Sequence, residues 1–238
     1  MSAATLEQVA EYGQSLVDQM VAELKAEPLD GYEHMAEIRN LAGEVTGFAR
    51  VYSAPRITKI THLSINIMPG ARYFNIVVAP DTRFDVPRFA HEGMVSTHGS
   101  QVSTDLYHDQ DLPMHIREFV ERTKGLTEIF QEAKASDIPF VPSRQVHMRA
   151  FCSPHFLNVF GATGEQLPQL AGYAQRYFSE WLGMHTAAAE LDAAEAANRL
   201  QRREHMSDMV IELDPDRNMV VQVYGEDTVA AIEKTVMY

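Results

Sequence analysis

Three acidic residues occupy segments in which a carboxyl group could act as an acid catalyst. Glu92 lies in FDVPRFAHEGMVS, Asp105 lies in QVSTDLY, and Asp214 lies in IELDPDRNM. Apolar surroundings disfavour the ionised form of a carboxyl group, so such a group can stay protonated near neutral pH and donate a proton. Taken singly, acids in these contexts are more often turn formers, helix caps or surface groups. The pattern alone leaves both interpretations open.

Polar side chains also alternate with apolar ones in three segments that we predict to be strands. His62 and Ser64 alternate with leucine and isoleucine in HLSINIM, Asn75 lies among apolar neighbours in YFNIVVA, and His147 and Arg149 alternate with apolar residues in QVHMRAF. Successive side chains of a strand point to opposite faces of a sheet. If these strands share one sheet, a face of it carries several polar groups in an apolar setting, as small-molecule pockets do.

Motifs of other chemistries are missing from the sequence. No phosphate-binding GxxxxGK loop occurs, and the glycine pair in GATG lacks the rest of a dinucleotide-binding motif. The ten histidines do not show HExxH spacing, and the single cysteine, Cys152, can form neither an intrachain disulfide nor a thiolate-rich metal site. No GxSxG motif occurs. We therefore predict no tightly bound nucleotide cofactor, no metal centre and no serine hydrolase activity.

The charge of the chain restricts its partners. Lys and Arg number 20 against 33 Asp and Glu, a formal net charge of -13. Such a charge repels phosphate backbones and anionic membrane surfaces, which argues against nucleic acid and membrane partners. The sequence has no apolar run long enough for a membrane helix, and its first residues lack a basic start and an apolar signal core. We expect a cytoplasmic protein, as a monomer or homodimer.

The elements that must position these residues follow from hydrophobic periodicity. Apolar residues recur at helical spacing over residues 5–25, and Thr5 and Gln8 have the spacing of a capping box. Between residues 44 and 107, short runs separated by Pro and Gly predict hairpin-linked strands and hence an antiparallel sheet.

Helical patterns resume after the strands. They cover residues 113–133 and 165–209, and a last helix follows Gly225. This order predicts an α+β fold, with helices layered on a mostly antiparallel sheet. No repeat, linker or boundary divides the sequence, so residues 1–238 are predicted to form one domain.

Several segments, in order, resemble one enzyme superfamily. They are PRFAHEGMVS with VSTDLYHDQDL, then VHMRAFCSP, then EWL, and finally DPDRNMVVQVYGED. Together they run from about Thr61 to the C-terminus and are similar to segments of the red chlorophyll catabolite reductases and the ferredoxin-dependent bilin reductases. The resemblance is closer to the former group. It implies a three-layer α/β/α sandwich that binds a linear tetrapyrrole between the sheet and the C-terminal helices.

The resemblance also implies roles for individual residues. Glu92 matches the acid of the chlorophyll catabolite reductases, and Asp214 matches a second acid of both groups. Arg149 matches an arginine that pairs with a propionate. Asn75 falls where one bilin reductase subgroup has histidine, and Ser64 falls near that subgroup's glutamate, so that subgroup's particular reduction is not implied here.

The implied chemistry needs no tightly bound cofactor. Reduced ferredoxin supplies electrons one at a time to the conjugated tetrapyrrole, and the protein supplies protons and keeps the radical from water. Glu92 and Asp214 are the expected proton donors, and Asp105 joins the expected substrate-binding residues. His62 and His147 are expected to contact pyrrole or lactam groups.

Alternatives remain at the level of substrate and of class. Biliverdin is the expected substrate, and a red chlorophyll catabolite, favoured by Glu92, is the alternative. A non-catalytic tetrapyrrole carrier is favoured by the acidic charge, and a module without a ligand is a third possibility.

An acidic ferredoxin requires a local basic patch. The two candidate patches are Arg199, Arg202 and Arg203, and Arg50, Arg56 and Lys59.

Overall fold

The runs separated by Pro and Gly fold into the long antiparallel hairpins that their punctuation predicts. The computed structural model describes residues 3–238. Gly70, with φ of 72°, turns the chain between two of the strands, in a left-handed conformation that favours glycine. The strands are β1 (Glu27–Pro28), β2 (Ile38–Arg39), β3 (Val45–Ala54), β4 (Ile57–Met68), β5 (Ala71–Pro80), β6 (Arg88–Ser96), β7 (Ser100–Tyr107) and β8 (Leu157–Ala162).

These strands form one sheet, with the order β1-β3-β4-β5-β6-β7-β8 and with β2 beside β3. Every strand pair in the sheet is antiparallel. The helices are α1 (Leu6–Glu11), α2 (Gln14–Leu24), α3 (Ile116–Arg122), α4 (Lys124–Ala135), α5 (Val146–Phe151), α6 (Leu167–Ala187), α7 (Ala193–Glu212), α8 (Arg217–Tyr224) and α9 (Glu226–Met237). Short 3-10 turns cover Glu33–Met35 and Leu112–His115. The predicted α+β class is confirmed.

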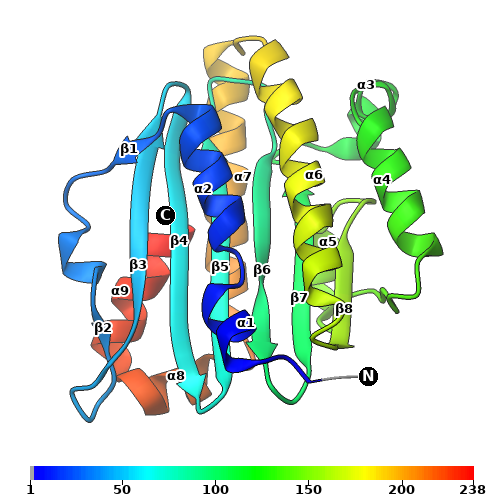
Figure 1. The fold of residues 1–238 in the computed structure, drawn as a ribbon. Helices are drawn as coiled ribbons and strands as arrows, with labels where there is room; N and C mark the ends of the chain where they lie inside the picture. Colours follow the sequence, from blue (N-terminus) through cyan, green and yellow to red (C-terminus); the bar gives the residue numbers. More distant parts are fainter. Residues whose placement is uncertain (1–2) are drawn as a thin grey trace.

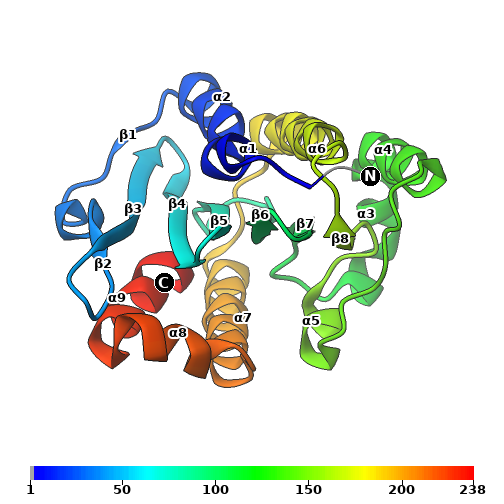
Figure 2. The same ribbon diagram turned by 60° about the horizontal axis from the view of Figure 1, so that its bottom comes forward.

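Helices lie on both sides of the sheet, as Figure 1 and Figure 2 show. On one side α1, α2 and α6 cover the strands, and the larger apolar core forms there from residues such as Met20, Phe74 and Trp181. On the other side lie α7, α8 and α9, with a smaller core that includes Leu63 and Ile232. The chain is therefore a three-layer α/β/α sandwich, as the resemblance implied.

Three predicted helical stretches are each divided. The stretch expected over residues 113–133 forms a 3-10 turn and the helices α3 and α4, which meet at Thr123. The helix expected over residues 5–25 breaks at Gly13, which has a φ of 85°. The capping box of Thr5 and Gln8 is confirmed at its start. The long pattern over residues 165–209 is interrupted between α6 and α7, where the side chain of Asp192 accepts a hydrogen bond from the Glu195 backbone and begins a new helix.

The strand predicted in QVHMRAF is wrong, because Val146–Phe151 forms the short helix α5. Alternation over so few residues does not separate a strand from a helical turn. The sheet edge is taken instead by the preceding residues. Phe140 bridges to Val159 of β8, and the Val141 amide donates to the Asn158 carbonyl at 2.8 Å. The strand β8 itself was not predicted.

Candidate functional site

A row of four side chains crosses the middle of the sheet. Leu63 lies opposite Asn75, Asn75 lies opposite Glu92, and Glu92 lies opposite Ser103. Directly opposed residues of antiparallel strands point to the same face. Leu63 belongs to the core formed with α9, so the row lies on the side of the sheet that α7, α8 and α9 cover. We call this side the Glu92 face.

Glu92 is held by one hydrogen bond to each carboxyl oxygen. The Asn75 amide donates to Oε2 at 2.9 Å from β5, and the Tyr107 hydroxyl donates to Oε1 at 3.2 Å from β7. Burial raises the pKa of Glu92, and the charge of Asp214 raises it further, while the two hydrogen bonds act in the opposite direction. The net upward shift favours the protonated acid, which is the form that a proton donor requires.

The Glu92 face is only partly covered by helices. On β5 the side chains that point toward α2 and α6, Phe74, Ile76 and Val78, are buried, with exposed fractions of 0–1%. On the same strand, Tyr73 and Val77 point to the Glu92 face and are partly exposed. Over β5 the side under α2 and α6 is therefore sealed, whereas the side that carries Glu92 retains solvent access around the acid.

Asp214 follows the end of α7 and is exposed. One of its carboxyl oxygens accepts a hydrogen bond from the Asp216 backbone at 2.9 Å. Partial desolvation raises its pKa, with a smaller upward effect of the Asp216 and Glu233 charges and an opposing effect of His147. The charge of Asp214 raises the pKa of Glu92, so the turn after α7 brings the second predicted acid to the same side of the sheet as the first.

Asp105 is buried on the Glu92 face, but its carboxylate has partners of its own. It accepts a hydrogen bond from the Ser153 amide at 2.8 Å and another from the Ser153 hydroxyl. Burial raises its pKa to about 6, which those hydrogen bonds oppose and the charge of Glu92 assists. Asp105 therefore ties β7 to the segment that follows α5.

His147 and Arg149 lie on α5, beside α7, and not in the sheet. His147 is partly buried and close enough to Asp214 for its charge to lower the pKa of that acid. Arg149 is exposed and borders a surface cavity of about 320 Å³. The other residues that line this cavity include Phe130, Lys134, Phe140, Cys152 and Phe156.

His62 and Ser64 lie on the opposite side of the sheet from Glu92. His62 pairs with Ile76 and Ser64 with Phe74, both residues of the larger core. Burial lowers the pKa of His62 to about 4, with a smaller effect of neighbouring arginines, so its ring is neutral near pH 7. The expectation that these residues share a polar face with Asn75 is wrong. The register of β4 places Leu63, and not His62 or Ser64, on the same face as Asn75 and Glu92.

Tyr107 was not among the predicted site residues, although it contacts Glu92 directly. A signal for it exists in the sequence, because Ser103, Asp105 and Tyr107 alternate along one strand and therefore share a face.

Among residues 3–238 no group of three or more His, Cys, Asp or Glu side chains could hold a metal ion. No helix in that range is long and apolar enough to cross a membrane.

The sequence and the fold of this chain both resemble those of known proteins. The tomato phytochromobilin synthase, solved in complex with biliverdin, shares the fold with a TM-score of 0.77 at 16% identity, over 92% of this chain and 80% of that one. The phycoerythrobilin:ferredoxin oxidoreductase of Synechococcus sp. (strain CC9902) is 27% identical, and the match spans 71% of this chain and 66% of the length of that relative. A family model described as ferredoxin-dependent bilin reductase matches residues 14–237. The chain therefore belongs to the ferredoxin-dependent bilin reductase family.

Proposed function

We propose that this protein reduces a linear tetrapyrrole of the biliverdin type with electrons from reduced ferredoxin. The observation that carries the proposal is the position of Glu92, an acid with a raised pKa on a sheet face that is only partly covered. Membership of the bilin reductase family supplies the substrate class and the electron donor. The curated relative is named for the reduction of a bilin with ferredoxin, which supports the same assignment.

The proposed reaction divides the work between the substrate and the protein. Reduction of one double bond of the tetrapyrrole consumes two electrons, which arrive singly from ferredoxin, and two protons. Glu92 delivers one proton from the centre of the sheet. Asp214 delivers the other from the turn after α7. The helices on this side limit contact between water and the radical formed after the first electron.

The remaining predicted residues take different places in this proposal. Asn75 orients Glu92 through its amide, and Arg149, exposed on α5, binds a propionate through its guanidinium group. His147 lies near Asp214 and contacts the polar edge of the substrate. His62 and Ser64 lie across the sheet and take no part in the proposed site on the Glu92 face.

We place the ferredoxin contact elsewhere than on the two arginine and lysine clusters that the sequence suggested. Arg199 and Arg203 are engaged in ion pairs with Asp85 and Asp109, and Lys59 is buried, with its ammonium group donating to the Thr235 carbonyl. By contrast, residues 138–164 contain no acidic residue in a chain with a net charge of -13. Arg144 is exposed within this range. We assign the ferredoxin contact to this surface by charge complementarity.

Anaerobic absorbance spectroscopy tests the proposal. The purified protein is mixed with biliverdin, and reduced ferredoxin is then added with its reductase system. We expect a bound spectrum first and then a blue-shifted product. A bound spectrum that reduced ferredoxin never changes would favour the carrier or a red chlorophyll catabolite as substrate. The absence of any spectral change on mixing would contradict bilin binding.

A further inference from the structure

We infer that Tyr107 positions Glu92 for proton delivery, an assignment that rests on the proposed reduction. Glu92 is on β6, and each of its carboxyl oxygens has one hydrogen-bond donor from a neighbouring strand. The Tyr107 hydroxyl is the donor to Oε1, and the Asn75 amide is the donor to Oε2. Removing either donor frees the carboxyl group to rotate away from the direction in which it is now held.

Tyr107 reaches Glu92 along the sheet and not directly across it. The residue opposite Tyr107 is Arg88, four positions before Glu92 on β6. Ala90 lies between Arg88 and Glu92 on the same face. The tyrosine hydroxyl thereby meets the acid at 3.2 Å while its backbone pairs with a different part of the strand.

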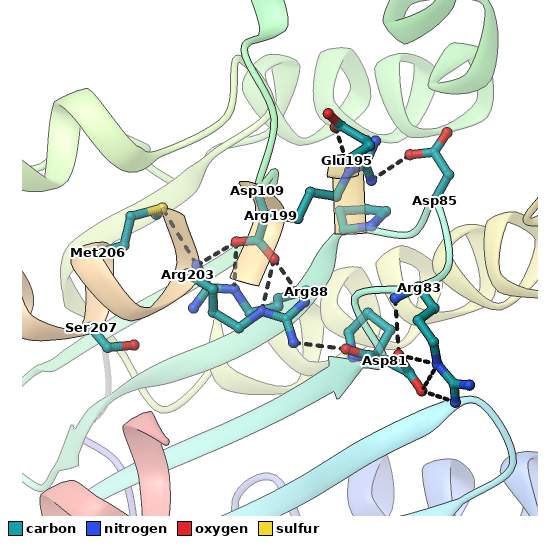
Figure 3. A network of polar contacts seen from close by, with 12 residues as sticks. Asp81, Arg83, Asp85, Arg88, Asp109, Glu195, Arg199, Arg203, Met206 and Ser207 are labelled. Atoms are coloured by element: carbon teal, nitrogen blue, oxygen red, sulfur yellow. Dashed lines mark hydrogen bonds and ion pairs between the residues drawn. The ribbon is translucent and has the colours of Figure 1, made fainter. Parts of the chain in front are cut away.

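The ring of Tyr107 also packs near Arg88, which belongs to a buried cluster of charged side chains. The Arg88 guanidinium carbon lies 5.7 Å from the centre of the Tyr107 ring. Arg88 donates to the buried Asp109 carboxylate at 3.1 Å, and Arg203 of α7 donates to the same carboxylate at 2.7 and 2.9 Å. Figure 3 shows Asp109 between the two arginines. This packing restrains the ring that carries the hydroxyl group.

The phenol of Tyr107 can form a hydrogen bond with Glu92 in both protonation states of the acid. Its hydroxyl can donate to a carboxylate and can accept from a carboxylic acid. Burial and the charge of Glu92 raise the pKa of Tyr107 well above its usual range, so the hydroxyl keeps its proton. The Asn75 carbonyl oxygen is buried without a hydrogen-bond partner, and rotation of that amide would offer it to protonated Glu92. Both neighbours can therefore hold the acid before and after it donates.

The experiment compares Tyr107→Phe with Tyr12→Phe. Tyr12 is a suitable control because its hydroxyl is buried without a partner and lies near His91 and Phe74, on the other side of the sheet. The protonation of Glu92 is followed by isotope-edited infrared spectroscopy of its carboxylic acid C=O stretch, assigned with Glu92→Gln. In Tyr107→Phe we expect the titration of Glu92 to move upward by about one pKa unit, because a donor to the carboxylate is lost. Tyr12→Phe should leave it unchanged.

The turnover of the same variants gives a second readout. If protonated Glu92 is the reactive form, the alkaline limb of the kcat profile should move to higher pH in Tyr107→Phe by the same interval, with KM for biliverdin nearly unchanged. Site-specific 3-fluorotyrosine at position 107 is a stronger donor and should move both titrations to lower pH. A purely structural role for Tyr107 does not produce opposite shifts in the two variants.

The outcomes separate the inference from the proposed function. An unchanged Glu92 titration in both the phenylalanine and the fluorotyrosine variants would overturn the role of Tyr107. Opposite infrared shifts in a protein that binds biliverdin but never reduces it would support the contact between Tyr107 and Glu92 and would contradict the proposed reduction.

Discussion

At the scale of single residues, the face of the sheet on which a side chain lies affects its pKa more than its neighbours in the sequence do. Glu92 and His91 are neighbours in the chain, yet they point to opposite faces. His91 is fully buried, its Nδ1 lies 2.8 Å from the Thr104 hydroxyl, and burial lowers its pKa to about 3. His91 is therefore neutral and adds no charge beside Glu92. The pKa of Glu92 depends instead on burial, on Asn75 and Tyr107, and on the charge of Asp214.

Asp105 gives the protein a pH-dependent stability. Its folded-state pKa of about 6 exceeds the value of a free aspartate, so the folded state favours the protonated form. The contribution to stability is therefore largest below about pH 4 and is lost as the pH rises through about 6, which amounts to about 3 kcal/mol. We expect Asp105→Asn, which cannot ionise, to lack this decline in urea unfolding. A difference between the two proteins that stays constant over that pH range would contradict the assignment.

At the scale of elements, α7 is fastened to the sheet by charges as well as by apolar contacts. Asp109 is buried and accepts hydrogen bonds from Arg88 of β6 and Arg203 of α7 (Figure 3). Arg203 also donates to the Pro80 carbonyl at 2.7 Å. The position of α7, which covers part of the Glu92 face, thus depends on the buried acid Asp109.

Loss of that acid should destabilise the fold. Asp109→Asn leaves two arginines without a counter-charge, and we expect a loss of about 3 to 5 kcal/mol in the free energy of unfolding. Glu132→Gln is the matched control, because Glu132 pairs with Arg176 on the exposed surface and should cost no more than about 1 kcal/mol. Equal losses in the two variants, measured by denaturant titration, would argue against a special role for the buried cluster.

The segment that contains α5 should control the encounter with ferredoxin. Arg144→Glu reverses a charge in the acid-free range and should raise KM for ferredoxin several-fold, more strongly at low salt, with KM for biliverdin unchanged. Arg117→Glu changes an exposed arginine of α3 and serves as the control. Equal effects of the two substitutions would place the ferredoxin contact elsewhere.

At the scale of the whole molecule, the two sides of the sheet differ in how completely they are covered. The side under α2 and α6 is sealed over β5 and holds most of the apolar core. The Glu92 face has a smaller core and retains partly exposed positions in its centre. The larger apolar core and the site of the proposed reduction therefore lie on opposite sides of one sheet.

Two adjacent residues of β5 test this separation. Ile76 is fully buried in the larger core, so Ile76→Ala should cost about 2 to 5 kcal/mol in unfolding free energy. Val77 is partly exposed on the Glu92 face, so Val77→Ala should cost less than half as much and should weaken biliverdin binding. The separation fails if Val77→Ala destabilises the protein as much as Ile76→Ala and leaves biliverdin affinity intact.

Much of the architecture could be predicted from the sequence, because helical and strand periods and the Pro and Gly punctuation are local signals. Register is not local. The alternation in β4 identified His62 and Ser64 as one set, but only the pairing with β5 shows that Leu63 shares the face of Asn75 and Glu92. The same limit applies to α5. Its alternating sequence predicts a strand, and only the structure shows that Phe140 already occupies the edge of β8.

The most direct test of the central claim is a single-turnover reduction of bound biliverdin by Glu92→Gln, under anaerobic conditions with reduced ferredoxin. Glutamine keeps the size of the side chain but cannot donate the acid proton, so the variant should bind biliverdin and form product about 10² to 10⁴ times more slowly than the unmodified protein. Glu121→Gln, an exposed acid of α3, should react at the normal rate. Product formation by Glu92→Gln at the rate of the unmodified protein would contradict the assignment of Glu92 as the proton donor.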